Sequence, residues 1–196
     1  GGNGVANSTV YGGIAGDTMG ADIRNMSNLR VPDEDVLAEE IMRATRPLSQ
    51  TPDLVQPLRN QLQEVMWEDV GVMRTAAGMQ RGLDKIARIR DELMQVGVAA
   101  DNLAFNLTWH DWLNMASLCD ISEVIAKAGL ARENSRGAHY REDFPDAGAL
   151  EDSYFTVAQQ REGDVKVTRE VVDFSIVQPG ETILPEGEPE TLVTAQ

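Results

Sequence analysis

The chain has 196 residues and a mass of 21.5 kDa, which is the size of one domain or of one domain with a small appendage. Its hydrophobic content of 42% is enough for a buried core and excludes a wholly disordered chain. The 32 acidic residues outnumber the 17 basic ones, and this balance argues against broad nucleic-acid binding, which needs Lys and Arg to replace counterions.

Residues 1–30 are rich in glycine, and their pattern predicts a helix with one smooth face. Ser8, Gly12, Gly16 and Gly20 recur every four residues, so a helix would align them in a stripe without bulky side chains. Each glycine inside a helix costs about 1 kcal/mol relative to alanine. The stripe therefore suggests that the backbone approaches another surface or a ligand closely, with a flexible linker as the alternative. The glycines lack the spacing of a dinucleotide-binding fingerprint, and no strand precedes them.

A short helix is predicted over residues 32–46. It begins at Pro32 with acidic residues in its first turn, where the helix dipole favours negative charge, and Pro47 ends it.

Apolar residues then recur at intervals of three and four, which predicts three long amphipathic helices. These helices span residues 54–75, about 78–96, and 102–131. Gly97 follows the second helix and is interpreted as the C-terminal glycine that closes it. Successive long helices joined by short links predict an antiparallel three-helix bundle, similar to a spectrin repeat.

The composition changes after residue 134. Residues 135–145 are too polar and irregular to form a core. From Tyr154 to Val171, apolar and polar residues alternate on both sides of a turn at residues 162–164, which predicts a β-hairpin. Residues 178–196 contain three prolines and four glutamates and are predicted to form an extended or disordered acidic tail.

These patterns together predict a mainly α protein, in which an antiparallel three-helix bundle follows an N-terminal Gly-rich helical segment and precedes a C-terminal β-hairpin. We divide the chain into the Gly-rich segment (1–30), the helical bundle (31–134), a loop with the hairpin (135–177) and the acidic tail (178–196).

Two histidines and one cysteine are the obvious candidates for metal binding or nucleophilic catalysis. His110 lies between Trp109 and Trp112 and lacks good partners at i+3 and i+4, so packing between aromatic side chains is favoured over metal ligation. Cys119 is interpreted as a small buried residue, because a catalytic thiol needs exposure and a nearby base. A single cysteine also excludes an internal disulfide framework and a cysteine-cluster metal site, and it fits a reducing cytosol.

Arg136, His139 and Arg141 form the sharpest local cluster of charge, and Glu142 and Asp143 follow them directly. The cluster could hold an anionic group, or it could fasten its loop to the bundle as a salt-bridge latch. The latch is favoured, because charged runs are more often structural. No Ser/His/Asp or Cys/His arrangement, phosphate loop or carboxylate pair of similar quality is present, so the residues alone indicate no complete active site.

No stretch of the sequence approaches the ~20 apolar residues that span a bilayer, and no basic region followed by an apolar one marks a secretory signal. We therefore expect a cytoplasmic location, with any membrane attachment made through a partner. The chain begins Gly-Gly-Asn-Gly without Met and is expected to be the middle of something larger.

Three segments, taken together, resemble a known family. They are residues 1–16 (GGNGVANSTVYGGIAG), 71–83 (GVMRTAAGMQRGL) and 131–145 (ARENSRGAHYREDFP). In this order and spacing they are similar to the C-terminal third of the flavoprotein subunit of succinate dehydrogenase and fumarate reductase, a family that includes L-aspartate oxidase. The third segment is the most specific, and the resemblance covers about residues 1–175.

The resemblance implies an FAD-dependent parent oxidoreductase that interconverts succinate and fumarate, both C4 dicarboxylates. Asn3, Gly4 and Val5 would lie beside the isoalloxazine ring, where the free N–H groups of a helix N-terminus stabilise negative charge on the reduced flavin. The glycine stripe would then press against the upstream FAD-binding domain. Gly4 and Val5 replace the Ser-Leu pair that is common in the family, which indicates a divergent branch.

The resemblance also implies that Arg136, His139 and Arg141 lie at the junction of the bundle with the FAD-binding domain and act in positioning. The family's proton donor and substrate-binding arginines lie upstream of Gly1, so no catalytic residue is expected in this chain, and the chain alone is expected to be inactive. An iron–sulfur subunit would carry electrons away and link the protein to the inner membrane.

Two other functions stay open at this point. The first is oxidation of L-aspartate by the same flavin chemistry, which would need no iron–sulfur partner. The second is a stand-alone helical docking module that binds a partner protein through exposed apolar seams. A fragment with an exposed apolar face is also expected to dimerise through it.

Overall fold

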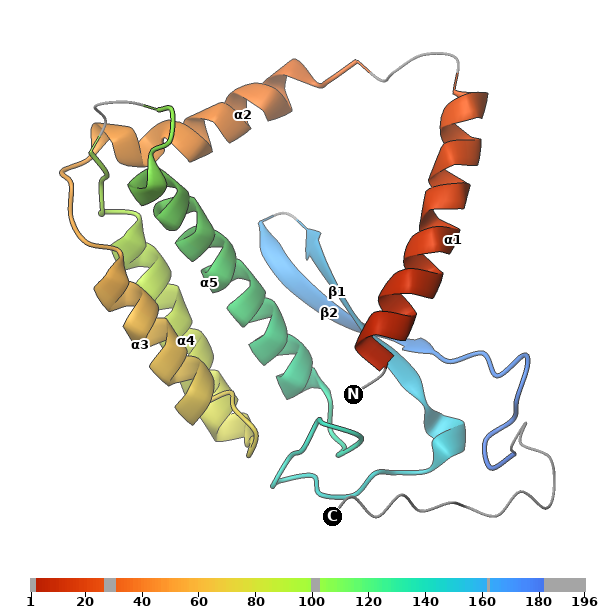
Figure 1. The fold of residues 1–196 in the computed structure, drawn as a ribbon. Helices are drawn as coiled ribbons and strands as arrows, with labels where there is room; N and C mark the ends of the chain where they lie inside the picture. The colour runs from red at the N-terminus through yellow and green to blue at the C-terminus, as the bar shows by residue number, and fades with distance from the viewer. Residues whose placement is uncertain (1–2, 27–30, 100–102, 162, 182–196) are drawn as a thin grey trace, which may run out of the picture. The chain divides into compact units, whose positions relative to one another are not determined.

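The structure is a computed structural model that describes residues 3–26, 31–99, 103–161 and 163–181. In chain order it contains helices α1 (Asn3–Asn25) and α2 (Glu34–Thr45), the 3₁₀ turn η1 (Arg46–Ser49), helices α3 (Gln56–Glu68), α4 (Ala76–Leu93) and α5 (Leu107–Ala131), the 3₁₀ turn η2 (Leu150–Asp152), and strands β1 (Tyr154–Arg161) and β2 (Asp164–Val171). The mainly α fold with a C-terminal hairpin is confirmed (Figure 1). Residues 1–44 and 45–196 form two compact units, and each is described by itself.

The first unit consists of α1 and most of α2. The Gly-rich segment forms the helix α1, as predicted. Its glycine stripe is open, because a Cβ built at Gly12 or Gly16 would meet no described atom within 4 Å. The close approach suggested by the stripe therefore has no counterpart within this unit and stays a prediction. The Asp33 carboxylate caps α2 by accepting hydrogen bonds from the backbone N–H groups of Asp35 (3.0 Å) and Val36 (3.4 Å).

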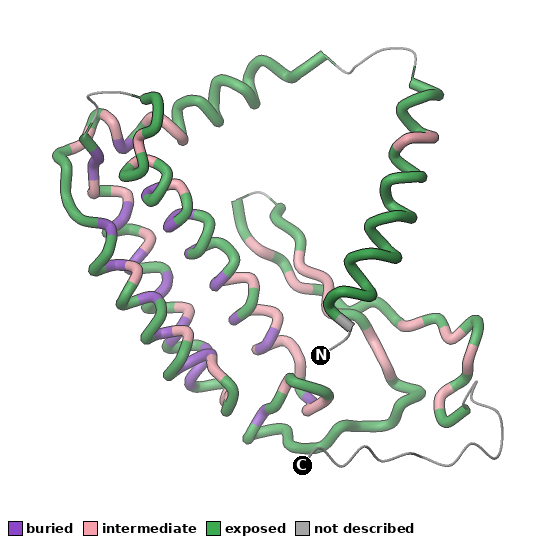
Figure 2. Tube along the Cα trace, viewed as in Figure 1, coloured by how far each residue is buried: buried purple, intermediate pink, exposed green. Residues whose placement is uncertain are grey.

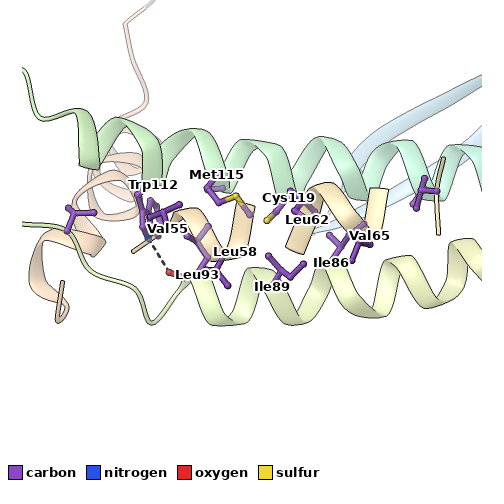
Figure 3. Close-up of a cluster of buried hydrophobic side chains, with 14 residues drawn as sticks. Val55, Leu58, Leu62, Val65, Ile86, Ile89, Leu93, Trp112, Met115 and Cys119 are labelled. Atoms are coloured by element: carbon purple, nitrogen blue, oxygen red, sulfur yellow. Dashed lines mark hydrogen bonds between the residues drawn. The ribbon is translucent and has the colours of Figure 1, made fainter. Parts of the chain in front are cut away.

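The second unit is built on α3, α4 and α5, which lie side by side and alternate in direction (Figure 1). The predicted antiparallel three-helix bundle is therefore confirmed. The buried residues gather on the faces that the three helices share (Figure 2). Apolar side chains from all three helices interdigitate there (Figure 3). The buried core comprises Val55, Leu58, Leu62, Val65, Val70, Ile86, Ile89, Leu93, Val98, Trp112, Met115, Ala116, Cys119 and Ala126.

Two of these helices are shorter than predicted, and side chains at their ends explain why. We expected a helix over 54–75, but α3 ends at Glu68 because the chain turns at Asp69, whose buried carboxylate accepts a hydrogen bond from Lys85 Nζ (2.7 Å). We expected a helix over 102–131, but α5 begins at Leu107. Asn106 caps it, since its side-chain oxygen accepts a hydrogen bond from the N–H of Trp109 (3.0 Å).

Gly97 does not close α4 in the manner predicted. The helix ends four residues earlier, at Leu93, and Gly97 is not among the described glycines that have a positive φ. Its small size matters instead, because its backbone pairs with the segment before α3. The N–H of Gly97 donates to the Thr51 carbonyl (3.0 Å), and the Gly97 carbonyl accepts from the N–H of Asp53 (3.2 Å). A Cβ at this position would collide with the backbone of Gln50 and Thr51.

The substitution Gly97→Ala is therefore expected to destabilise the second unit by about 1–3 kcal/mol, the usual cost of forcing atoms into a packed site. Urea unfolding followed by far-ultraviolet circular dichroism measures this loss. Gly13→Ala is the control, because a Cβ there meets no described atom within 4 Å and alanine favours a helix. An equal stability for Gly97→Ala and the unsubstituted chain would contradict the close approach.

Strands β1 and β2 form the antiparallel hairpin predicted for residues 154–171, with Tyr154 opposite Val171. The turn uses Gly163 at φ +83°, a conformation that glycine adopts readily. The hairpin packs on α5 and is fixed by Lys127, whose ammonium group contacts the carboxylates of Asp164 (2.6 Å) and Glu123 (2.8 Å).

The predicted boundaries of the four segments stay predictions, and residues 182–196 of the acidic tail lie outside the described residues. None of the described helices combines the length and the apolar character needed to cross a bilayer.

Candidate functional site

The charged loop singled out in the sequence borders an open cleft of about 730 Å³ in the second unit. The cleft lies where the C-terminal end of α5, the turn before α4 and the first residues of the hairpin meet. Three arginines and one histidine line it: Arg74, Arg132, Arg136 and His139. Two of the three predicted positioning residues, Arg136 and His139, therefore line one cleft. The third, Arg141, lies buried beside it with 1% of its surface exposed.

Arg141 closes the C-terminal end of α5. One guanidinium nitrogen, Nη1, lies within hydrogen-bond distance of the carbonyl oxygens of Gly129 (3.0 Å), Leu130 (3.1 Å) and Arg132 (3.1 Å). These carbonyls lie at the C-terminal end of α5, where few donors are available within the helix, and the helix dipole makes this end negative. The buried cation therefore supplies a charged donor to the carbonyl groups at the end of α5.

Asp143 links Arg141 to the start of α4. Its two carboxylate oxygens accept hydrogen bonds from Nε and Nη2 of Arg141, both at 2.7 Å, in a two-pronged pair. One oxygen also accepts from the backbone N–H of Ala76 (2.8 Å) at the start of α4. These bonds, those from Arg141 foremost, hold the pKa of the Asp143 carboxyl well below its usual range. We call the Arg141–Asp143 pair the latch.

The latch thus joins the end of one helix to the start of the helix packed against it. A second bond parallels it, from the N–H of Glu142 to the carbonyl of Arg74 (2.9 Å). The sequence favoured a salt-bridge latch that fastens this loop to the bundle over a site for an anionic group. The contacts of Arg141 are those of such a latch. The guanidinium of Arg141 also lies 4.9 Å from the ring centre of Phe144, within range of a cation–π contact.

Arg136 fastens a different segment. Its guanidinium donates to the carbonyl oxygens of Ala147 (2.5 Å) and Ala149 (2.5 Å) and to the hydroxyl of Ser153 (2.7 Å). All three nitrogens are used in these bonds, so Arg136 fixes the connection between the loop and β1. None of these partners carries a negative charge.

His139 lies between two arginines. Its Nδ1 atom is 2.8 Å from Nη1 of Arg74, and its Nε2 atom is 3.3 Å from the carbonyl oxygen of Arg132. A guanidinium can only donate, so Nδ1 must accept, and the ring proton lies on Nε2. His139 is therefore a neutral imidazole in this arrangement. Burial, and then the nearby charges of Arg74, Arg132 and Arg141, lower the pKa of His139 from its ordinary 6.5.

The lowered pKa of His139 predicts that the fold loses stability in mild acid. The unfolded chain takes up the proton at a pKa near 6.5, whereas the folded chain resists it. The contribution of His139 is therefore complete above pH 6.5 and declines as the pH falls toward the folded-state pKa. Urea midpoints measured on either side of that pH should differ. His139→Gln should reduce the difference and His110→Gln should preserve it, and the opposite pattern would contradict the assignment.

Sequence reasoning did not single out Arg74 and Arg132, although both lie in the family-like segments. Arg132 donates from Nη1 to the carbonyl of Tyr154 (3.3 Å) and to the hydroxyl of Thr156 (3.1 Å), and so ties α5 to β1. The ring of Tyr154 has the guanidinium of Arg132 at 4.9 Å and that of Arg169 at 4.7 Å from its centre. Only the fold brings residue 74 beside residue 139, so no local pattern could have shown this pairing.

The remaining candidates do not join this cluster. His110 is exposed and makes an edge contact with Trp109 at 6.0 Å between ring centres, whereas Trp112 is buried in the core. Cys119 is fully buried, and burial raises the pKa of its thiol to about 11, which fits the predicted inert side chain. Within the described residues, no group of three or more His, Cys, Asp or Glu side chains is arranged to hold a metal ion.

The three residues predicted to contact FAD lie at the beginning of α1 in the first unit. Asn3, Gly4 and Val5 form its first turn, which contains no acidic residue. Gly4 has open space where a Cβ would stand, and Val5 is 77% exposed. The backbone N–H groups of a first helical turn have no partner within the helix, so this turn can face an electron-rich group.

The fold and this cleft define a helical domain whose charged loop is built into its framework. A family model described as the C-terminal part of the fumarate reductase flavoprotein matches residues 59–184. The chain belongs to this family of flavoprotein C-terminal regions.

Individual relatives agree with this membership. The chain is 30% identical over 146 residues to a subunit of the CoM/CoB fumarate reductase of Methanothermobacter marburgensis, an alignment that covers 74% of this chain and 26% of the relative. It is 27% identical to the fumarate reductase flavoprotein of Mycobacterium tuberculosis, over 93% of this chain and 33% of the relative. L-aspartate oxidases of Ralstonia nicotianae and Synechocystis are also among the matches.

Among solved structures, Sdh1 of Mycobacterium smegmatis in complex with UQ1 matches with a TM-score of 0.71 and 25% sequence identity. The match covers 78% of this chain and 26% of that one. The chain therefore spans about a quarter to a third of the length of the relatives that it matches.

Proposed function

We propose that this chain is the C-terminal region of an FAD-dependent flavoprotein that interconverts succinate and fumarate, and that it supports the flavin-binding part of the same protein. The match of residues 59–184 to the fumarate reductase flavoprotein family carries the proposal. The match to Sdh1 at a TM-score of 0.71 supports it. Family membership also favours this function over a stand-alone docking module.

The arrangement of the charged loop supports a role in positioning. Arg141 and Arg136 make every contact described above with the chain's own helices, loop and hairpin, so their hydrogen bonds stabilise the domain. We propose that the loop they fix presents the junction with the flavin-binding domain. The reacting groups belong to the part of the parent protein that precedes this chain, and the isolated chain does not turn over fumarate.

FAD would supply the hydride-transfer chemistry in the parent protein. Asn3, Gly4 and Val5 would contribute to holding it, because they form the first turn of a 23-residue helix and place no acidic side chain there. The missing side chain of Gly4 leaves room for close contact. We further propose that an iron–sulfur subunit is the electron-transfer partner, that a C4 dicarboxylate is the substrate, and that partner subunits attach the protein to the inner membrane.

Sequencing the DNA upstream of the Gly1 codon tests the proposal first. The expected result is an in-frame extension of several hundred codons that carries an N-terminal Gly-x-Gly-x-x-Gly motif and leads into Gly-Gly-Asn. A start codon directly before Gly1 would overturn the proposal and return the docking module to first place.

A biochemical test compares the 196-residue chain with the extended protein. The purified 196-residue chain, given FAD, fumarate and a reduced viologen dye, is expected to show no turnover. The extended protein is expected to bind FAD and reduce fumarate under the same conditions. Turnover by the 196-residue chain itself would refute its assignment as a non-catalytic region.

L-aspartate oxidation is the second candidate, since L-aspartate oxidases are among the relatives. The extended protein decides between the two: a flavin reduced by L-aspartate and not by succinate would favour the oxidase. The same experiment shows whether an iron–sulfur subunit is retained on purification.

The predicted dimerisation rests on apolar side chains that α5 leaves partly uncovered, among them Leu118 (41% exposed), Ile121 (51%) and Ile125 (42%). These residues follow one another at helical spacing and share a face. Sedimentation of the 196-residue chain at increasing concentration tests for the dimer. A monomer at all concentrations would contradict it.

A further inference from the structure

The cleft between α5, the turn before α4 and the hairpin gathers positive charge in a strongly acidic chain. Arg74, Arg132 and Arg136 all line it, whereas the chain as a whole carries a net charge of −15. Near this region, Arg141 and Arg169 each have a carboxylate within 4.0 Å. Among the residues that the structure describes, no carboxylate lies within 4.0 Å of Arg74, Arg132 or Arg136. A concave surface lined by unneutralised cations concentrates its field on whatever enters it.

Two of the three guanidiniums also have bonding capacity left. Arg74 uses Nε for the carbonyls of Val70 and Gly71 and Nη1 for His139. Arg132 uses Nε for Asn134 and Nη1 for the hairpin. The Nη2 amino group of each has no hydrogen-bond partner among the residues described in the structure. Each can therefore donate to an oxyanion without breaking an existing bond.

The rest of the cleft wall is apolar. Phe155 is 59% exposed on β1, and Phe174 and Val172 line the cleft beyond the end of β2. Tyr154 also lines the cleft, and its ring centre lies 4.9 Å from the guanidinium of Arg132 and 4.7 Å from that of Arg169. A purely inorganic anion would use only the cationic side of this wall, whereas an anion with an apolar body would use both.

We propose that this cleft binds an organic carboxylate, whose charged group is held by Arg74 and Arg132 and whose apolar body lies against Phe155 and Phe174. This site goes beyond the proposed function, because it uses only residues of the second unit and requires no flavin. Its failure would leave the flavoprotein assignment untouched.

His139 provides a built-in reporter for the test. The charged groups around it are Arg74 from the turn, Arg132 from the end of α5, and Arg141, with its partner Asp143, from the loop. A carboxylate bound beside Arg74 and Arg132 would offset their field, and the pKa of His139 would rise. His110, the only other histidine in the sequence, is exposed and does not line the cleft, so it is an internal control.

The experiment is an NMR titration of the two histidines in the 196-residue chain with sodium benzoate, sodium phosphate and sodium chloride at matched ionic strength. Benzoate is expected to raise the pKa of His139 in a saturable manner, phosphate to act more weakly, and chloride to change both histidines only by screening. Equal responses to benzoate and chloride would overturn the site. Equal responses to benzoate and phosphate would overturn the role of the aromatic wall.

Substitutions of single residues test which side chains bind benzoate. Arg132→Gln is expected to weaken benzoate binding roughly tenfold or more, as the loss of a hydrogen bond to a charged group does. Arg161→Gln is the matched control, because Arg161 is exposed and bonds only to Gln159 among the described residues. Full binding by folded Arg132→Gln would overturn the assignment.

Phe155→Ser keeps the test valid if the arginine variant fails to fold, because Phe155 is largely exposed and does not belong to the buried core. This variant is expected to weaken benzoate binding several-fold while leaving the phosphate response unchanged. Unchanged benzoate binding would overturn the proposed contact with the apolar body.

Discussion

Arg141→Ala is expected to lower the free energy of unfolding by about 3–5 kcal/mol, the typical cost of breaking a buried ion pair. The side chain is almost completely buried and bonds to three carbonyl oxygens at the end of α5 and to both oxygens of Asp143. Its removal takes one donor from each of those carbonyls and two donors from the carboxylate. Urea unfolding of the purified chain measures the loss.

Two further variants test whether the loss comes from the specific contacts of Arg141. Arg141→Lys keeps the charge but not the forked geometry, so it should recover only a small part of the stability. Arg161→Ala removes an exposed arginine on β1 and should change the stability by less than about 0.5 kcal/mol. A loss below about 1 kcal/mol for Arg141→Ala would show that the latch is dispensable.

Trp112→Ala is expected to cost a similar amount, about 3–5 kcal/mol, through a different mechanism. Trp112 is 1% exposed near the beginning of α5, and its indole N–H donates to the carbonyl of Leu93 (3.1 Å), the last residue of α4. Alanine would leave a cavity where the ring now packs and would remove that bond. The loss should appear as a lower urea midpoint with little change in the denaturant dependence.

Trp67→Ala is the matched control for the tryptophan series. Trp67 is 73% exposed at the end of α3, so its loss should change the stability by less than about 0.5 kcal/mol. Trp112→Phe separates packing from hydrogen bonding, because it keeps most of the ring and removes only the donor, at a cost near 1 kcal/mol. Equal effects of Trp67→Ala and Trp112→Ala would contradict the placement of the core.

The helices were predictable because their evidence is local. Apolar residues such as Leu58, Leu62 and Val65 recur at intervals that place them on one helical face, and that face is buried. Helix ends were harder to predict, because they depend on single side chains with distant partners. Asp69, which lies just after α3, binds Lys85 and Arg81 from the next helix, and the apolar spacing carries no trace of these contacts.

Some features of the candidate site could likewise be predicted from the sequence, and others could not. The cluster from Arg136 to Arg141 was visible as a run of charge, and its structural role was weighed from that alone. The participation of Arg74 could not be predicted from the sequence. Arg74 and His139 are 65 residues apart, and only the packing of α4 on α5 brings them together. The sequence likewise could not show that Gly97 is required for backbone contact with Gln50, since any helix-ending glycine produces the same pattern.

The latch also determines how the second unit opens in its native state. Residues 135–143 contain no helix or strand longer than an isolated bridge, yet their bonds reach the end of one helix and the start of another. Exchange of the Glu142 amide hydrogen, which is bonded to the carbonyl of Arg74, is therefore expected to require this connection to loosen. A segment without regular structure is in this case expected to hold an amide hydrogen that exchanges slowly, whereas the free ends of helices ordinarily fray first.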